Sequence, residues 1–256
     1  MLVGLLTVVD VRPLTSTMVR IGFTGSGLSV LDTWPDQQLK LCIPKPDQRE
    51  PRLPESDPDD VMSWYQAFMA IPEAERPWMR SFTVRRLTGD RMEIDFVLGD
   101  HGPAARWATT ARPGDVVGRY GPSADYRRPL PAADWYLFAG DETAVPATAT
   151  LLESLPEART MVWLAASPQP MPGPVQWVSS PEEVVAAVRS VTFPPGSGAA
   201  WLAGEAGLVR ASRRSLVERG MPKSRIEFTG YWRRALSQDD APTAADLAEA
   251  QERLSG

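Results

Sequence analysis

Residues Arg80 to Arg85 combine three side-chain types that suit a ligand carrying both a phosphate group and an aromatic ring. The string reads Arg-Ser-Phe-Thr-Val-Arg, and strand alternation places residues 80, 82 and 84 on one face. Twist at a strand end still lets Arg80, Phe82 and Thr83 share one ligand. The arginine suits a phosphate, the ring can stack, and the hydroxyl can hydrogen-bond a ring nitrogen. An ordinary strand with two solvated arginines would show the same string.

A second candidate site begins about twenty residues later, at Gly102. Gly102-Pro103-Ala104-Ala105 reads as the start of a helix with proline in its first turn. Backbone N–H groups at such an end, together with the positive end of the helix dipole, form a seat for a diphosphate. The alternative is a helix that only fills the interior of a barrel, with Trp107 in the core.

The third candidate is an acidic turn between a strand and a helix. The strand Trp135–Ala139 runs into Gly140-Asp141-Glu142-Thr143, and Pro146 stands in the first turn of the helix that follows. The turn occupies the place of a dinucleotide fingerprint but does not match Gly-x-Gly-x-x-Gly. Because Asp141 and Glu142 would repel a pyrophosphate, a nicotinamide cofactor must bind here in a different arrangement.

Composition excludes several other kinds of chemistry. The chain of 256 residues has a net charge of −5, which argues against a nucleic-acid partner. One cysteine, Cys42, and one histidine, His101, permit neither a disulfide nor a metal site of the Cys or His type. Redox chemistry must therefore come from an organic cofactor or a metal carried by a ligand. With no export signal and no apolar stretch of ~20 residues, we expect a cytoplasmic protein without membrane insertion.

The elements that position these residues change in kind near residue 130. The first part reads as six short strands separated by Gly, Pro, Asp or Ser, which predicts a six-stranded antiparallel barrel over residues 1–127. These strands are Leu5–Val11, Met18–Phe23, Gln38–Ile43, Ser81–Leu87, Arg91–Leu98 and Asp115–Tyr120. An excursion from Pro44 to Pro77 interrupts them and contains a predicted helix over Val61–Met69.

From residue 133 to 256, strands alternate with helices, which predicts a parallel-sheet α/β domain that binds a nucleotide. Its predicted strands are Trp135–Ala139, Thr160–Ala165, Val175–Ser179, Ala199–Leu202 and Ile226–Thr229. Its predicted helices are Val145–Ser154, Glu182–Ser190 and Val209–Arg219, with a terminal helix over Pro242–Leu254.

Several strings, taken in order, resemble the siderophore-interacting proteins, the NAD(P)H-dependent ferric-siderophore reductases of the ferredoxin-reductase-like superfamily. They are Arg80–Arg85, Ile94–Leu98 with Gly102–Ala108, Gly140–Ala147, Trp201–Glu205 and Gly230–Arg233. The first resembles the superfamily's Arg-x-Tyr-Thr/Ser flavin motif. The acidic turn and Gly-Tyr-Trp-Arg are specific to the family, and the similarity runs from about Leu6 to Arg234.

The resemblance implies an FAD-dependent reductase that passes electrons from NAD(P)H to an Fe(III)-siderophore and releases iron as Fe(II). No protein metal ligands and no obligate protein partner are implied. Thr83 is the expected catalytic residue, and Lys40 and Arg233 are expected to bind the anionic ferric siderophore. The expected cofactor-binding residues are Arg80, Phe82, Thr83, Val84, Gly102, Pro103, Ala104, Ala105, Asp141, Thr143, Tyr231 and Trp232.

The chain departs from the family pattern at two positions. Phe82 stands where the family usually has tyrosine, so stacking can remain while the phenol's hydrogen bond is lost. Gly99 stands where a histidine is common, and we do not expect His101, two residues on, to be equivalent.

Two other functions therefore stay open, a general flavin or ferric reductase and a non-catalytic siderophore-binding protein. The donor is equally open. Arg210, Arg213 and Arg214 could bind the 2′-phosphate of NADPH or form a solvated helix face.

Overall fold

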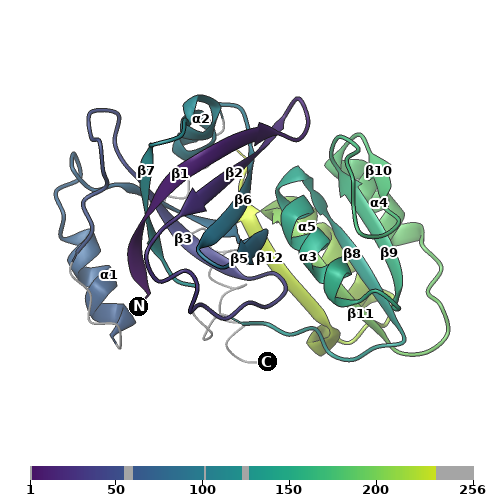
Figure 1. Ribbon diagram of the computed structural model, residues 1–256. Helices are drawn as coiled ribbons and strands as arrows, with labels where there is room; N and C mark the ends of the chain where they lie inside the picture. Colours follow the sequence, from purple (N-terminus) through teal and green to yellow (C-terminus); the bar gives the residue numbers. More distant parts are fainter. Residues whose placement is uncertain (1, 55–59, 101, 123–126, 235–256) are drawn as a thin grey trace. The chain divides into compact units, whose positions relative to one another are not determined.

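The computed structural model describes residues 2–54, 60–100, 102–122 and 127–234. Contacts divide the chain into two compact units (Figure 1). The barrel unit comprises Met1–Arg127 together with Val145–Pro156 and Ser167–Gly173. The parallel-sheet unit comprises Arg128–Ala144, Glu157–Ala166 and Pro174–Gly256. The division into two domains at residues 127 and 133 stays a prediction.

The barrel unit is built on one antiparallel sheet of seven strands in the order β4-β3-β7-β1-β2-β6-β5. Its strands are β1 (Val3–Pro13), β2 (Met18–Thr24), β3 (Gln38–Ile43), β4 (Trp78–Thr83), β5 (Arg86–Thr88), β6 (Arg91–Val97) and β7 (Val116–Tyr120). The helices of this unit are α1 (Val61–Met69), α2 (Pro103–Thr110) and α3 (Val145–Ser154).

The prediction of six strands was one strand short, because the segment predicted as Ser81–Leu87 forms two. Thr83 still pairs with Gln38 of β3, and the Val84 N–H donates to the Gln37 carbonyl at 2.7 Å. The next residue, Arg85, donates its N–H to Glu93 of β6 at 2.9 Å. The chain thus leaves one edge of the sheet and joins the other, which curls the sheet into a half-barrel.

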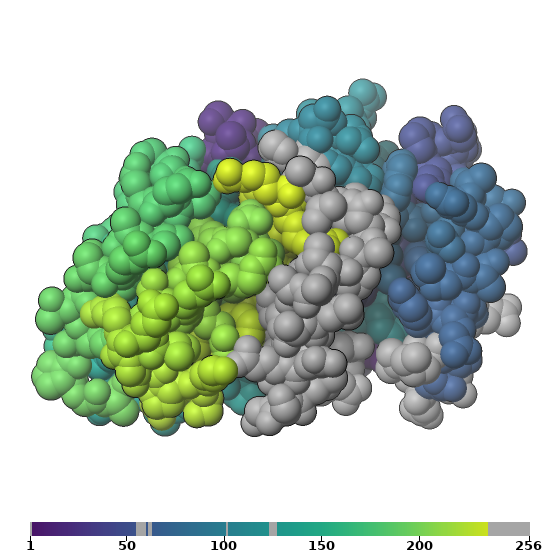
Figure 2. Space-filling model, turned by 180° about the vertical axis from the view of Figure 1, so that it is seen from behind, coloured from purple at the N-terminus to yellow at the C-terminus, as the bar shows by residue number. Residues whose placement is uncertain are grey.

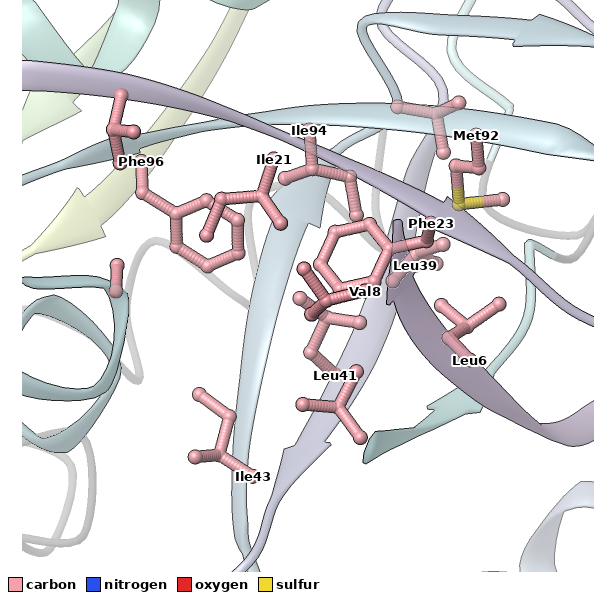
Figure 3. Packing of buried hydrophobic residues seen from close by; sticks show 14 of the residues in the cluster. Leu6, Val8, Ile21, Phe23, Leu39, Leu41, Ile43, Met92, Ile94 and Phe96 are labelled. Atoms are coloured by element: carbon pink, nitrogen blue, oxygen red, sulfur yellow. The ribbon is translucent and has the colours of Figure 1, made fainter. Parts of the chain in front are cut away.

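The interior of the half-barrel is filled by alternate apolar side chains of its strands. Figure 3 shows them pointing toward one another from β1, β2, β3 and β6. Phe23, Ile21 and Leu41 are fully buried there. Burial of such side chains stabilises the fold by ~1.5–3 kcal/mol each, so this core holds the strand ends that carry the candidate site.

Helix α1 covers the outer side of β3 and β7. Its N-cap, Asp60, accepts a hydrogen bond from the Ser63 N–H at 2.9 Å. Trp64 stacks on Tyr120 with ring centroids 4.4 Å apart, and both pack around the buried Cys42. The prediction of a helix over Val61–Met69 is confirmed, and Cys42 is a buried, free thiol.

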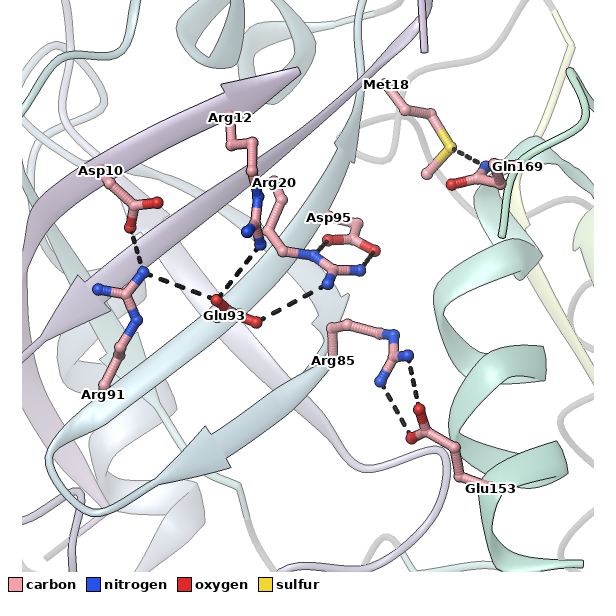
Figure 4. Close-up of polar contacts among 10 residues, drawn as sticks. All are labelled: Asp10, Arg12, Met18, Arg20, Arg85, Arg91, Glu93, Asp95, Glu153 and Gln169. Carbon is pink, nitrogen blue, oxygen red and sulfur yellow. Dashed lines mark hydrogen bonds and ion pairs between the residues drawn. The ribbon is translucent and has the colours of Figure 1, made fainter. Parts of the chain in front are cut away.

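The outer side of the same sheet is polar over β1, β2 and β6 (Figure 4). Arg20 binds Asp95 through two hydrogen bonds of 2.6 and 2.7 Å. Arg85 binds Glu153 of α3 in the same bidentate way, at 3.0 and 2.7 Å. Helix α3 is thereby held to the loop that directly follows the Arg80–Val84 string.

The parallel-sheet unit contains five parallel strands in the order β10-β9-β8-β11-β12. They are β8 (Trp135–Asp141), β9 (Arg159–Ala165), β10 (Gln176–Val178), β11 (Gly198–Glu205) and β12 (Ile226–Trp232). Helices α4 (Pro181–Ser190) and α5 (Ala206–Glu218) pack against each other and against this sheet. Residues of α5 and after it reach the surface in yellow-green in Figure 2.

The fold class predicted from the sequence is confirmed: an antiparallel half-barrel precedes a parallel sheet with helices. The terminal helix over Pro242–Leu254 falls outside the described residues. Within the described part of the chain, no helix is both long enough and apolar enough to span a membrane.

Candidate functional site

The first group of candidate residues lies at the end of β4. Arg80 and Thr83 are buried, and Phe82 is half-buried. Arg80 donates to the Met79 carbonyl at 3.0 Å, among other contacts. Among the described residues the Thr83 hydroxyl has no hydrogen-bond partner, so it is available to a ligand. Val84 has its N–H bound to Gln37 and its side chain in the core, which leaves only its carbonyl for a ligand.

The second group forms the N-terminus of α2. Gly102 is its N-cap, with φ 138°, and no side chain caps the helix. A Cβ at Gly102 would meet no atom within 4 Å apart from its chain neighbours, so the space beside this residue is open. The N–H groups of Ala104 and Ala105 have no partner within the helix, because the first turn has none to offer. Open space, uncapped donors and a dipole end fit a diphosphate.

The half-barrel brings these two groups together, since α2 packs against β3, β4 and β6. A series of aromatic rings lies between β4 and α2. Phe82 lies 4.5 Å from Phe96 between ring centroids, and Phe96 lies 5.6 Å from Trp107 of α2. Trp107 therefore packs against the core, and Phe82 is held in place by its ring neighbours. His101 lies outside the described residues.

Lys40 projects from the outer face of β3, opposite Ser81. Its ammonium donates to the Ser81 hydroxyl at 2.6 Å. Although the side chain is solvent-exposed, neighbouring atoms displace enough water to lower the pKa of Lys40. Burial raises the pKa of the nearby Cys42 thiol to about 12. Lys40 is thus a cation close to neutral thiol and hydroxyl groups.

The remaining candidate residues lie at the carboxyl ends of β8 and β12 in the parallel-sheet unit. Asp141 accepts hydrogen bonds from Thr143 and from the indole of Trp232. Tyr231 and Arg233 are half-buried beside Trp232, and both make contacts of their own. The sequence predicts Asp141, Thr143 and Trp232 as cofactor-binding residues, and the structure shows that they hydrogen-bond to one another.

Two residues of this region were not singled out as site residues. Gly204 and Glu205 end β11 beside Asp141, and the Glu205 N–H donates to the Asp141 carboxylate at 2.7 Å. Their place in the Trp201–Glu205 string was the only available signal. Among the described residues, no group of three or more Cys, His, Asp or Glu side chains could hold a metal ion.

Residues 7–126 match the siderophore-interacting FAD-binding domain, and residues 133–235 match the siderophore-interacting protein domain. The chain belongs to the siderophore-interacting protein family. The sequence resemblance is therefore confirmed, and the half-barrel is a FAD-binding domain of ferredoxin-reductase-like fold.

Relatives in this family include both uncharacterized proteins and reductases. Uncharacterized protein Rv2895c of Mycobacterium tuberculosis is 34% identical over 91% of this chain and 90% of its own length. Ferric vibriobactin reductase ViuB of Vibrio cholerae is 29% identical, over 92% and 91%. The NADPH-dependent ferric-chelate reductase of Escherichia coli is 26% identical, over 89% and 91%.

Solved structures agree with this assignment. A siderophore utilization protein from T. fusca matches with a TM-score of 0.79 and 34% identity, covering 93% of this chain and 95% of that one. The siderophore-interacting protein SipS from Aeromonas hydrophila matches with a TM-score of 0.76 and 27% identity, covering 99% and 98%.

Proposed function

We propose that this protein is an FAD-dependent reductase that passes electrons from NAD(P)H to an Fe(III)-siderophore. The observation that carries the proposal is the uncapped N-terminus of α2, a helix that packs against β4, the strand that carries Arg80 and Thr83. Membership in a family whose members include ferric vibriobactin reductase and ferric-chelate reductase supports it. FAD, when bound, supplies the conversion of a two-electron hydride donor into single electrons for Fe(III).

In this proposal, different residues of the half-barrel bind different parts of FAD. Arg80 and the α2 N–H groups hold the phosphates, because both offer donors and positive charge. Phe82 packs against the ring system, and its own place is fixed by Phe96. Thr83 is the catalytic residue, since its hydroxyl is available to hydrogen-bond the ring nitrogen that receives hydride. Phe82 cannot add the hydrogen bond that a tyrosine would supply.

Lys40 and Arg233 are the proposed contacts of the ferric siderophore. Siderophores of the catecholate type are anionic, and the protein carries a net charge of −5, so local positive charge is needed to hold them. The Lys40–Ser81 pair offers a cation and a hydroxyl on adjacent strands. Reduction releases the iron, because Fe(II) binds the oxygen donors of siderophores far more weakly than Fe(III). Iron is thus a substrate and needs no protein ligands.

NADPH is the proposed donor. Arg210 and Arg214 are exposed on α5, where a 2′-phosphate could bind them. Arg213 packs its guanidinium over the Phe228 ring at 4.4 Å, which makes it the weakest of the three candidates. The E. coli relative is an NADPH-dependent reductase, which supports the same choice.

The test uses protein loaded with FAD and freed of excess cofactor. NADPH or NADH and a ferric catecholate are added without oxygen, and an Fe(II) chelator reports reduction. We expect saturable Fe(II) formation well above that of free FAD with the same reagents. Protein that stays colourless after incubation with FAD would contradict the proposal and favour a siderophore-binding role. Fe(II) formation that never saturates with the ferric siderophore would favour a general reductase.

A further inference from the structure

The carboxylate of Asp141 is the centre of a hydrogen-bond network at the carboxyl edge of the parallel sheet. One of its oxygens accepts from the backbone N–H and the hydroxyl of Thr143, at 2.9 and 2.6 Å. The other accepts from the Glu205 N–H at 2.7 Å and the Trp232 indole N–H at 2.8 Å. A carboxylate accepts about four hydrogen bonds in all, so these four donors use its full capacity.

The backbone around Asp141 is shaped to bring these donors in. Gly204 has φ 125°, and a Cβ there would lie 2.7 Å from the Asp141 carboxyl group. A Cβ at Gly140 would lie 2.4 Å from the Ala203 carbonyl oxygen and 2.5 Å from the Ala144 Cβ. Only glycine fits at either position. The two glycines therefore let the ends of β8 and β11 approach closely enough for one carboxylate to join them.

Two of the acids at this edge, Asp141 and Glu205, accept hydrogen bonds from donors of the protein. Asp141 is 6% exposed, and the Glu205 carboxylate caps α5 by accepting from the Leu208 N–H at 3.0 Å. Glu205 also accepts from the Arg234 N–H at 3.3 Å. A nucleotide phosphate at this edge would thus meet acids whose lone pairs already face donors. The repulsion expected from Asp141 in the sequence is reduced accordingly.

Trp232 is the member of the network that a ligand could contact directly. It ends β12, is half-buried, and its indole N–H is anchored to Asp141. In open α/β sheets, ligands bind outside the carboxyl ends of the strands. We infer that Asp141 is a positioning residue, which fixes the indole of Trp232 at this edge and thereby shapes the site for the nicotinamide nucleotide. This inference rests on the proposed function.

The test compares two tryptophans that each donate an indole hydrogen bond within the same sheet. Trp232→Phe removes the bond to Asp141 and keeps an aromatic ring. Trp163→Phe is the matched control, because it removes an indole bond of 2.9 Å to the Gln176 side chain instead. Binding of NADP⁺ and NAD⁺ to the oxidised, FAD-loaded protein is measured by titration calorimetry, so no turnover is needed.

We expect Trp232→Phe to weaken nucleotide binding about tenfold, and Trp163→Phe to leave it within about twofold. Both variants should keep their FAD. In ¹⁵N-labelled protein, the indole N–H resonance of Trp232 should lie downfield and shift upfield in Asp141→Asn, because a neutral amide accepts more weakly.

Equal nucleotide affinity of the two phenylalanine variants would overturn the inference and leave the proposed function intact. A wild-type protein that binds neither nucleotide would overturn both. If Asp141→Asn does not fold, the comparison of the two tryptophan variants still decides the question.

Discussion

The guanidinium of Arg80 is the group whose removal should most affect flavin binding. We predict that Arg80→Ala loses FAD on gel filtration, because the charge-assisted bonds to a phosphate are lost. The visible flavin absorbance per protein measures the loss, and an unchanged far-UV circular dichroism spectrum shows that the fold is kept. Arg86→Ala, at an exposed arginine of β5, is the control and should stay yellow. Equal flavin content in the two variants would show that Arg80 does not bind FAD.

The hydroxyl of Thr83 is predicted to act on hydride transfer rather than on flavin binding. Thr83→Val should slow anaerobic flavin reduction by NADPH about tenfold, the effect of one hydrogen bond lost. FAD content should stay unchanged, since the residue keeps its shape. Thr83→Ser restores the hydroxyl and should recover most of the rate in stopped-flow measurements. A slow serine variant would assign the effect to packing of the methyl group.

Cys42 should be an unreactive thiol in the folded protein. Burial raises its pKa to about 12, so the thiolate is scarce at neutral pH. A disulfide reagent at pH 8 should react slowly with the native protein and rapidly in urea. The folded pKa exceeds that of the unfolded chain. The contribution of the buried Cys42 thiol to the free energy of unfolding is therefore fully present below the unfolded pKa, and it declines as the pH rises toward 12. Fast native labelling would contradict the burial.

At the scale of elements, the N-terminus of α2 should matter for FAD through its open backbone. Gly102→Ala forces an alanine to φ 138° and should weaken FAD binding by shifting the first-turn N–H groups. Gly114→Ala is a matched control, because Gly114 also has a positive φ, 97°, and open space around it. Both variants should lose ~1 kcal/mol of stability, measured by urea unfolding. Only Gly102→Ala should lose flavin affinity, and an equal loss in both would refute the phosphate seat.

Local patterns were enough to predict most elements of this fold. Apolar periodicity and capping predicted α1 and α3 with the observed bounds and β3 residue for residue. The split between β4 and β5 could not be predicted in this way. It depends on a hydrogen bond from the Arg85 N–H to Glu93 of a different strand, and this tertiary pairing has no local signal in the sequence.

The candidate site was predictable only in part, for the same reason. Short strings were enough to propose Arg80–Thr83 and the start of α2 as candidates, because each is a local motif. The Asp141 network joins residues that lie 64 and 91 positions apart, so no spacing in the sequence reveals it. That the hydrogen-bonding capacity of Asp141 is used within the protein is therefore visible only in the structure.

At the scale of the whole molecule, the net charge of −5 opposes binding of an anionic ferric chelate. Lys40→Gln should therefore raise the KM for a ferric catecholate severalfold, and leave that for a neutral ferric chelate unchanged. Lys45→Gln is the control, since Lys45 packs over the Trp78 ring at 4.3 Å. Desolvation lowers the pKa of Lys40, so affinity for the anionic chelate should decline with rising pH earlier than an ordinary lysine would allow. A KM unaffected by Lys40→Gln at every pH would remove Lys40 from the substrate site.

The central claim is that hydride equivalents entering from NAD(P)H leave as single electrons to siderophore-bound Fe(III). The stoichiometry of the reaction without oxygen tests it most directly, with NADPH oxidation and trapped Fe(II) followed in the same cuvette. FAD-loaded protein should give about two Fe(II) per NADPH oxidised, with a rate that saturates in ferric siderophore. NADPH oxidation without Fe(II), or no oxidation by yellow protein with either nicotinamide, would contradict the claim.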